Sequence, residues 1–518
     1  MTLLQLFVIV VLLFCVWFRW QMRHMIKFSK LHKNNLKSIP IVGHSYIFLT
    51  CKNNSDQWKC LESIGREAVN QGGVTVMWSL QKMYFIVADP IVAESVMKQC
   101  LEKDDAMKIA LAAIGDGSNV AEVPIWRPRR KILSSTFTPR NLKTFTTVFS
   151  KQSEIMVQKL HKVAETGSVS MFDYLIECAV DIVCGRFLSG FWQLILPFLL
   201  SGLETSLGIN PDARMNSNQK LIKALSECFT LVSERIMKPW LQNELIYSLT
   251  PQYRRFMVHK ETIRNHISEI IRIRRKEYEQ NIKKGDSDKD RLRTFMELMI
   301  ESSGVDAGYD DKELLSEIVV IITAATDTSS VGSAFTCVLL ARHPDIQEKV
   351  YKEIKEVFSD SEPVTFEKLA ELKYMSAVIM ESLRLYPPAP NVVRKVDRDV
   401  ILPSGDTLPK ATAIMLSIFA ANRNPRYWGD DAEEFRPERF MGSSLKHHSA
   451  FLSFSSGPRN CVGYRYGMLS MKAALTNILR NFRLLPISEQ DLGKPMNLES
   501  DLMLRDTDGF QVKLEPRV

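Results

Sequence analysis

Most of the chain repeats apolar and polar positions with a helical period. The stretch ISEIIRIRRKEYEQNIKK, near residues 267–284, places isoleucines on one side and charged residues on the other. Two portions instead show the two-residue alternation and β-branched content of strands: residues 74–89, where the break SLQK predicts a hairpin, and the region near 400–417. Pro90 predicts the start of a helix that runs to about Lys98. The pattern therefore predicts a mainly α protein with small β-sheets.

The N-terminus differs, because residues 2–18 are apolar and carry no charge. As a helix they would span about 25 Å, near the lower limit for crossing a bilayer. Basic residues follow the segment and none precedes it, which places the rest of the chain in the cytosol. A cleaved signal peptide needs a positive start and a small-residue cleavage site, and both are missing. We predict a transmembrane signal anchor at 1–18, a basic and proline hinge linker at 19–40 and a globular domain at 41–518.

Composition narrows the possible partners. Hydrophobic residues are 45% and charged residues 24%, which is typical of a globular chain with a large core. The net charge of +8 fits an anionic membrane or an acidic protein, and we expect no nucleic acid because no nucleic-acid module is recognisable. The 9 cysteines include no CxxC pair, which argues against a disulfide framework or zinc site and favours a reducing compartment.

The stretch FSSGPRNCVG, which begins at Phe454, is the candidate centre of the chemistry. Its cysteine, Cys461, lies between Gly457 and Gly463 and close to the positive charge of Arg459. Inward-pointing N–H groups of a tight turn lower the pKa of a thiol, and the thiolate is the form that binds metals. A small buried cysteine is the usual alternative. The spacing Phe-x-x-Gly-x-Arg-x-Cys-x-Gly resembles the haem-binding loop of the cytochromes P450.

The resemblance extends from about Pro40 to the C-terminus and looks most like a microsomal, insect-type member related to the fatty-acid hydroxylase branch. It implies the cytochrome P450 fold and a haem b cofactor (iron protoporphyrin IX), with Cys461 as axial ligand of the haem iron. Arg459 would contact a haem propionate, and the ring of Phe454 would shield the sulfur. A thiolate ligand favours O–O cleavage, so this choice of ligand indicates oxygen activation.

Trp126 and Arg130 have a spacing that places them one helical turn apart. The pattern Trp-x-x-x-Arg matches the family's helix that binds a haem propionate, whereas a surface cation–π pair is the alternative. Pro128 is tolerated only in the first turn, so we expect the helix to start close to Trp126. Arg394 resembles another propionate contact.

Residues 317–337 predict an apolar helix that is interrupted by the string Ala-Ala-Thr-Asp-Thr-Ser. A buried acid is costly unless it is paired or functional, and a kinked core helix is the alternative. The string is similar to the family's oxygen-activating segment, in which Thr328 would hydrogen-bond dioxygen and Asp327 would deliver protons through water. Ala325 replaces the usual Gly. Ala324 stands where some fatty-acid hydroxylases carry a Glu esterified to the haem, so we expect no covalent bond.

Glu381 and Arg384 form a Glu-x-x-Arg pair on a predicted helix, and Arg439 lies in the string FRPERF. Together they resemble the family's buried Glu-Arg-Arg network, in which one carboxylate is hydrogen-bonded between two guanidinium groups. We interpret them as structural support for the Cys461 loop and not as catalysts.

Residues 185–203, GRFLSGFWQLILPFLLSGL, interrupt the resemblance. A membrane-dipping element is one interpretation, but a second crossing would split the body of the protein. We favour a gene-model artefact such as an unspliced intron.

The resemblance implies a monooxygenase anchored in the endoplasmic reticulum membrane, which inserts one oxygen atom from O2 into a hydrophobic molecule such as a fatty acid, pheromone-like lipid, hormone or xenobiotic. Electrons would come from NADPH through NADPH-cytochrome P450 reductase, with cytochrome b5 as a second partner, because the chain has no GxGxxG fingerprint. Basic residues that would dock an acidic partner are Arg127, Arg129, Lys131, Arg465 and Lys472. The alternatives are an oxygen-independent isomerase or dehydratase on the same fold, and a non-catalytic haem or lipid carrier.

Overall fold

The computed structural model describes residues 5, 6, 9, 13, 17 and 19–517, with gaps at 33, 40, 41, 81, 112–114, 116, 166, 184–210, 284–294, 302–308, 360, 361 and 443–445. Most of the predicted anchor at 1–18 and the whole insert at 185–203 lie outside the described residues. Both therefore stay predictions.

Helices dominate the described chain, as the sequence pattern predicts. In chain order they are α2 (Arg23–Leu31), α3 (Tyr46–Leu49), α4 (Asn54–Asn70), α5 (Pro90–Gln99), α6 (Asp105–Leu111), α7 (Val123–Thr136), α8 (Pro139–His161), α9 (Met171–Val183), α11 (Pro211–Met237), η1 (Pro239–Gln242), α12 (Glu244–Ser248), α13 (Pro251–Lys283), α14 (Phe295–Glu301), α15 (Asp311–Arg342), α16 (Pro344–Val357), α17 (Phe366–Glu371), α18 (Lys373–Leu385), α19 (Ile418–Ala421), α20 (Pro425–Trp428), η2 (Pro437–Phe440), α21 (Tyr464–Asn481) and η3 (Glu489–Asp491).

The strands are short and form small sheets. They are β1 (Val74–Ser79), β2 (Lys82–Val87), β3 (Ser168–Ser170), β4 (Asn391–Lys395), β5 (Val400–Ile401), β6 (Thr407–Leu408), β7 (Ala413–Ser417), β8 (Phe482–Leu485), β9 (Leu498–Ser500), β10 (Leu504–Asp506) and β11 (Gln511–Pro516). The largest described sheet has the order β1-β2-β7-β4, and a second has the order β3-β11-β8.

The hairpin predicted around SLQK is confirmed, because β1 and β2 pair antiparallel up to the pair Ser79–Lys82. Strand β2 then runs parallel to β7, and β4 pairs antiparallel on the far side of β7. Helix α5 begins at Pro90 as predicted. Its N-cap is Asp89, whose Oδ1 accepts the N–H groups of Ile91 and Val92 at 2.9 and 3.0 Å.

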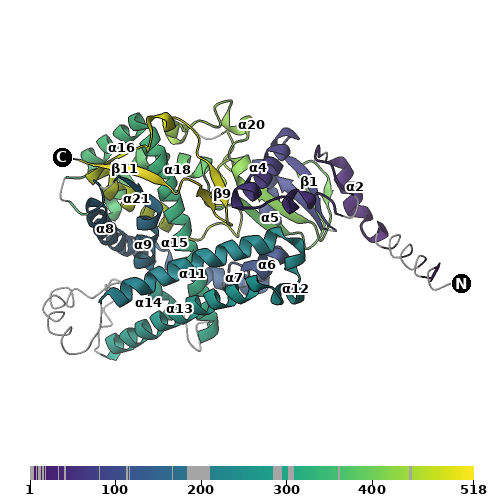
Figure 1. Ribbon diagram of the computed structural model, residues 1–518, viewed down its shortest axis with the longest axis horizontal. Coiled ribbons are helices and arrows are strands. Elements are labelled where there is room, and N and C mark those ends of the chain that lie inside the picture. Colours follow the sequence, from purple (N-terminus) through teal and green to yellow (C-terminus); the bar gives the residue numbers. More distant parts are fainter. Residues whose placement is uncertain are drawn as a thin grey trace.

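Helix α15 runs through the centre of the molecule and contacts α9, α13, α18 and α21 (Figure 1). A capping box starts it, in which Asp310 and Glu313 each bind the other's backbone N–H. It is the one helix among the described residues that is long and apolar enough to cross a membrane. Because about two thirds of its most apolar part is buried in the protein, it is a core helix.

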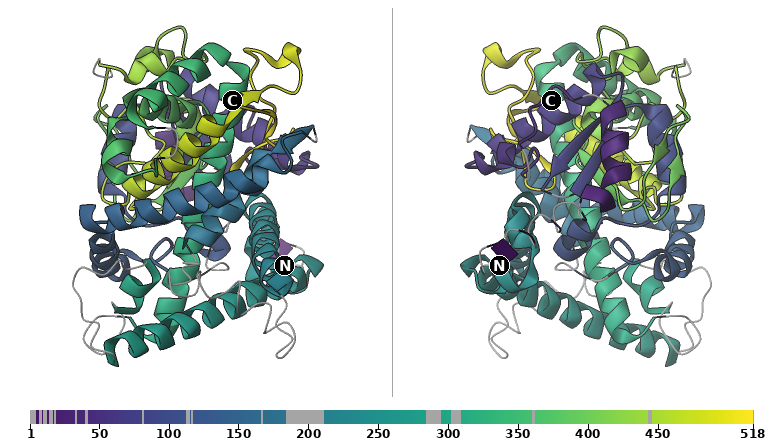
Figure 2. Two further views of the ribbon diagram at one scale, coloured as in Figure 1. Left: turned by 90° about the vertical axis from the view of Figure 1, so that its left-hand side faces the viewer. Right: turned by 90° about the vertical axis from the view of Figure 1, so that its right-hand side faces the viewer.

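The remaining elements surround α15 in two groups. The sheet of β1 lies with α4 and α5 at one end of the molecule, while α8, α16 and α21 lie at the other (Figure 1). The long helices α11 and α13 contact each other and form an outer layer on the side opposite the C-terminus (Figure 2). This arrangement packs α15 against α21, the helix that follows the loop of Cys461.

Candidate functional site

A strip along the middle of α15 is open to solvent, although most of this helix is buried. Ala324 is exposed, and Val320, Ile321, Ala325 and Thr328 are partly exposed. Because these positions are three or four residues apart, they share one face of the helix. Most of their side chains are small or apolar, so a flat apolar molecule can approach the helix here. We call this face the open strip.

Asp327 and Thr328 are adjacent in the chain but have different surroundings. The Thr328 hydroxyl lies on the open strip and donates to the carbonyl oxygen of Ala324 at 2.7 Å. Asp327 is buried, and its Oδ1 accepts a hydrogen bond from Nη2 of Arg505 at 2.7 Å. Burial lowers the pKa of Arg505, but Asp327 and Asp501 outweigh that effect and raise it. Asp327 is therefore a buried, paired carboxylate.

The Cys461 loop is a tight turn in which Ser455 and Gly457 have positive φ angles of 60° and 73°. The N–H of Cys461 donates to the carbonyl oxygen of Phe454 at 2.9 Å, and the Phe454 ring lies edge-on to Tyr464 at 4.5 Å. An ideal Cβ on Gly457 would lie 2.5 Å from the carbonyl oxygen of Met97, so only glycine allows the loop to seat on α5. The loop is thus fixed from both sides.

The Cys461 side chain is exposed, whereas the other described free cysteines are partly or fully buried. Burial of the sulfur among surrounding protein atoms raises the pKa of the thiol, while the Gly463 N–H and the charge of Arg130 oppose that rise. The sulfur is thus open to solvent on one side, while protein atoms surround most of it. A bound metal ion would oppose this rise, because the thiolate is the form that binds metals.

Trp126 and Arg130 lie on α7, and both contact the Cys461 loop. The Arg459 guanidinium lies 4.4 Å from the centre of the Trp126 ring, and Arg130 donates to the backbone and side-chain oxygens of Asn460 at 2.8 and 2.7 Å. The predicted helix start near Trp126 is wrong, because α7 begins at Val123.

Two prolines explain this difference in the start of α7. Pro124 occupies the first turn, where its fixed φ favours the helix, so the helix begins before Trp126. Pro128 then falls inside the helix, where the missing N–H removes one hydrogen bond in the second turn.

Three cations gather between the Cys461 loop and β4 without a carboxylate ion-pair partner among the described residues. Burial and the neighbouring Arg459 together lower the pKa of Arg394 to about 10. Burial lowers the pKa of Arg459 to about 10 against the opposing charge of Glu102. Burial, Arg394 and Arg459 lower the pKa of Lys103. The Nε atoms of Arg394 and Arg459 are buried and make no hydrogen bond within the described chain. We call Lys103, Arg394 and Arg459 the cation cluster.

Glu381, Arg384 and Arg439 lie together and are buried. Glu381 accepts two hydrogen bonds from Arg384 at 2.7 and 2.8 Å and one from Arg439 at 3.2 Å. The remaining guanidinium N–H groups donate to backbone oxygens of residues 422–434. This network ties α18 to the segment that leads toward the Cys461 loop.

Sequence reasoning missed several of these contacts. It placed Arg129 and Lys472 on a docking surface, but both are buried, so that prediction is wrong for them. Arg129 pairs with Glu313 and Glu317 at 2.5 and 3.3 Å, and Lys472 donates to the carbonyl oxygen of Leu369 at 2.6 Å. Arg127, Lys131 and Arg465 are exposed, as expected.

Lys103 and Arg505 were also missed. Neither residue lies in a recognisable motif, and their neighbours come from distant parts of the chain. Sequence spacing alone therefore offered no signal for them.

Comparisons with known proteins agree on one family. The sequence model described as Cytochrome P450 matches residues 38–514. The chain is 28% identical to a Drosophila melanogaster protein described as Cytochrome P450 4c3, over 86% of this chain and 82% of that protein. It is 29% identical to Cytochrome P450 4d8 of Drosophila melanogaster, over 89% and 97%, and 30% identical to Cytochrome P450 4V2 of Mus musculus, over 76% and 72%.

Proposed function

The chain belongs to the cytochrome P450 family, as a monooxygenase with a haem-thiolate cofactor, and from this premise we propose that it inserts one oxygen atom from O2 into a lipid-like substrate. The observation that carries the proposal is the accessible Cys461 thiol in its glycine-containing turn. NADPH would supply electrons through NADPH-cytochrome P450 reductase, with cytochrome b5 as a second donor.

The residues present fit a haem. Cys461 offers a sulfur ligand, and Phe454 packs beside the loop. The cation cluster, with two orphaned buried Nε atoms, matches the two carboxylates of a haem b. Trp126 and Arg130 hold this side of the loop in place through their contacts with Arg459 and Asn460. Ala324 has no carboxylate, so the haem would be held without an ester bond.

A haem with a thiolate ligand supplies oxygen activation when bound. Thr328 and Asp327 would then hold and move protons at the open strip. The Thr328 hydroxyl lies on the open strip, where it can turn from Ala324 toward a bound molecule. Asp327 keeps one oxygen, Oδ2, buried and free of hydrogen bonds to the described residues, while Arg505 holds the other. That free oxygen is suited to a water that connects the acid with the hydroxyl.

The substrate would lie along the open strip. The apolar and small side chains of the open strip favour a long hydrophobic molecule over a polar one. A fatty acid, a pheromone-like lipid, a hormone or a xenobiotic meets this requirement. Arg127, Lys131 and Arg465 remain exposed basic residues that can meet an acidic redox partner.

The first test is the absorption spectrum of the reduced carbon-monoxide complex. Wild type is expected to show the thiolate-type band, Cys461→Ser to lose it, and the control Cys60→Ser to keep it. Retention of the band in Cys461→Ser would refute the role of this thiol.

Turnover with NADPH and the reductase then separates the functions. A monooxygenase consumes O2 and forms a hydroxylated product, an isomerase or dehydratase forms product without NADPH, and a carrier forms none. We expect the first result, and product formation without O2 would contradict it.

A further inference from the structure

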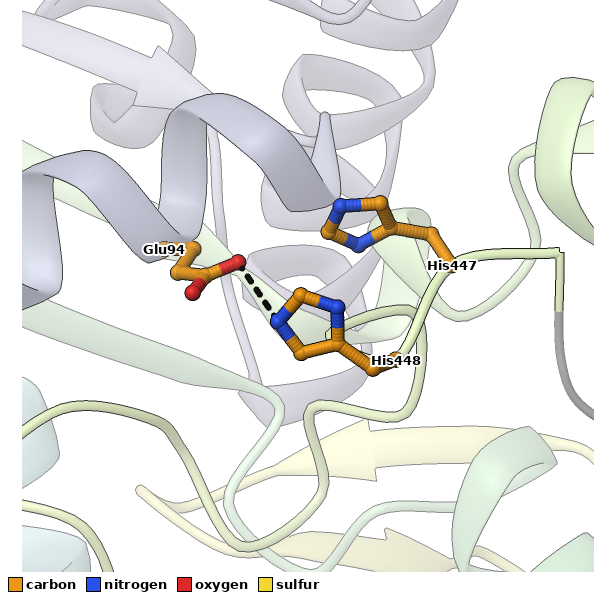
Figure 3. Close-up of side chains that lie close together, drawn as sticks. All are labelled: Glu94, His447 and His448. Carbon is orange, nitrogen blue, oxygen red and sulfur yellow. Dashed lines mark ion pairs between the residues drawn. The ribbon is translucent and has the colours of Figure 1, made fainter.

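Three potential metal ligands lie together outside the site described above. Glu94 lies on α5, and His447 and His448 lie in the segment that leads to the Cys461 loop (Figure 3). One ligand atom from each residue lies within 4.8 Å of the other two. Nε2 of His448 is already 3.1 Å from Oε2 of Glu94. The helix that carries Glu94 and the segment that carries both histidines are far apart in sequence, so the fold brings them together.

Ser449 orients two of these ligands at once. Its hydroxyl donates to Oε2 of Glu94 at 2.7 Å, and its backbone N–H donates to Nδ1 of His447 at 3.1 Å. A nitrogen that accepts a hydrogen bond carries a lone pair, so the His447 ring is held in a form that can bind a metal. A metal that binds Nδ1 of His447 takes over the lone pair that now accepts from Ser449, so this bond holds the ring only until the ion binds. The bond from the Ser449 hydroxyl to Glu94 is the contact that can remain as outer support of the site. The cluster is thus ordered before any ion binds.

Ring contacts further limit the motion of the histidines. The rings of His447 and His448 stack with their centres 4.5 Å apart, and the Tyr427 ring lies edge-on to His447 at 6.3 Å. The hydroxyl of Tyr427 is itself fixed, because it donates to Oδ2 of Asp89, the N-cap of α5, at 2.7 Å. Exposure of His448 leaves a path by which an ion can enter from solvent.

We propose that Glu94, His447 and His448 form a binding site for a zinc-like divalent transition metal ion. Two imidazoles and one carboxylate are a donor set that Zn²⁺ accepts, with water completing the coordination, whereas Mg²⁺ and Ca²⁺ prefer oxygen ligands alone. The ion would replace the hydrogen bond between His447 and Ser449 and the contact between His448 and Glu94. This site is separate from Cys461 and independent of the monooxygenase activity.

Lys98 is the charged neighbour that opposes a cation here. Its Nζ lies 2.5 Å from Oε1 of Glu94, whereas His448 and Ser449 contact Oε2. The two oxygens therefore serve different partners, and a metal at Oε2 leaves the Lys98 contact in place. Removal of the Lys98 charge should tighten metal binding, because a positive charge next to the ligand carboxylate would be lost.

Metal binding would join α5 to the segment before the Cys461 loop. The same helix already touches that loop at Gly457 through the Met97 carbonyl. An ion that binds only the folded chain raises its stability. Zinc is therefore expected to raise the melting temperature of the haem-loaded protein.

The test uses the full-length, haem-loaded protein without a histidine tag. Cys51→Ser serves as the background, because the sulfurs of Cys51 and Cys60 lie 3.4 Å apart and offer a second place for zinc. Zinc is titrated in competition with a chromophoric chelator, and melting is followed at the same zinc concentrations.

We expect one zinc per chain, at least tenfold weaker binding in His447→Ala and Glu94→Gln, and tighter binding in Lys98→Gln. The control His161→Ala, an exposed histidine elsewhere, should bind like the background protein. Equal zinc affinity in the background protein and the two ligand variants would overturn the site, as would an unchanged melting temperature at saturating zinc.

Discussion

At the scale of single residues, burial controls the titration of the Asp506 carboxylate. Burial raises its pKa from 3.8 to about 6, although the N–H groups of Phe510 and Asp508 donate to it and oppose the rise. The folded chain therefore holds this proton more tightly than the unfolded chain. The resulting stability is fully present below pH 3.8 and is lost as the pH rises through 6, a change of about 3 kcal/mol at most.

Asp506→Asn removes this titration. The free energy of unfolding of the variant, relative to wild type, should increase between pH 4.5 and 6.5 and level off above pH 7. Urea unfolding at fixed pH values measures the difference. Asp430→Asn, which changes an exposed carboxylate elsewhere in the chain, should keep the pH dependence of wild type. If the free energy of unfolding of Asp506→Asn changed with pH in parallel with that of wild type, Asp506 would not be the titrating group.

Arg384 and Arg436 allow a comparison of a buried ion pair with an exposed one. Arg384 and Glu381 are both fully buried, whereas the side chain of Arg436 is 52% exposed beside Asp431. Arg384→Met removes the partner that makes two of the hydrogen bonds to the buried Glu381 carboxylate. We therefore expect the free energy of unfolding to fall by about 3 to 5 kcal/mol. Arg436→Gln should cost less than about 1 kcal/mol. Unfolding of the haem-loaded proteins measures both, and similar losses would count against a structural role for the network.

Residue contacts were predictable where the partners are close in sequence. The spacing around Cys461 and the Glu-x-x-Arg pair of Glu381 and Arg384 are readable because each lies within one loop or one helical turn. Arg505 was not predictable, since its partner Asp327 comes from a helix far away in the chain. Long-range ion pairs depend on how the elements pack, and no local pattern encodes them.

At the scale of elements, the contact between α5 and the Cys461 loop depends on Gly457. Its φ of 73° and the short distance that a Cβ would have to the Met97 carbonyl both exclude a side chain. Gly457→Ala should therefore destabilise the protein by more than about 2 kcal/mol and shift the absorption band of the bound haem. Gly442 is a matched control, because its φ is 87° and no atom lies within 4 Å of its virtual Cβ.

Gly442→Ala should lose only about 1 kcal/mol, from backbone strain alone. Thermal unfolding and the visible spectrum report on both variants. Equal effects of the two substitutions would show that strain, and not the contact with α5, limits position 457.

Elements with strong patterns were predicted well. The hairpin of β1 and β2, the start of α5 and the apolar core helix α15 follow from alternation, a proline start signal and helical apolar spacing. The start of α7 was misjudged, since Pro124 and Pro128 both fit a first turn and the sequence does not choose between them. Helix ends depend on caps and contacts that are weaker than the periodic pattern.

At the scale of the whole molecule, an exposed apolar surface covers α12 and its neighbours. Leu245 and Leu249 are 78% and 84% exposed, and Trp240, Ile246 and Val258 are also exposed. Helix α12 lies at the end of the molecule from which α2 extends (Figure 1). Such a surface is typical of a membrane or protein contact. It favours the membrane location predicted from the sequence, independently of residues 1–18.

A chain that lacks residues 1–18 should still bind lipid vesicles, and the double variant Leu245→Ser with Leu249→Ser should lose most of that binding. Ile401→Ser is the control, because Ile401 is 68% exposed on β5, outside this surface. Vesicle flotation at high salt measures the apolar contribution, since salt screens charge interactions. Unchanged flotation of the double variant would contradict the membrane role of this surface.

The cation cluster has a consequence for the life of the protein in the cell. A newly made chain must bring Lys103, Arg394 and Arg459 together, and their mutual repulsion opposes this step until a dianion joins them. Chains that wait for the cofactor are thus exposed to proteases for longer. Haem supply, rather than the rate of translation, should then set how much of this protein accumulates.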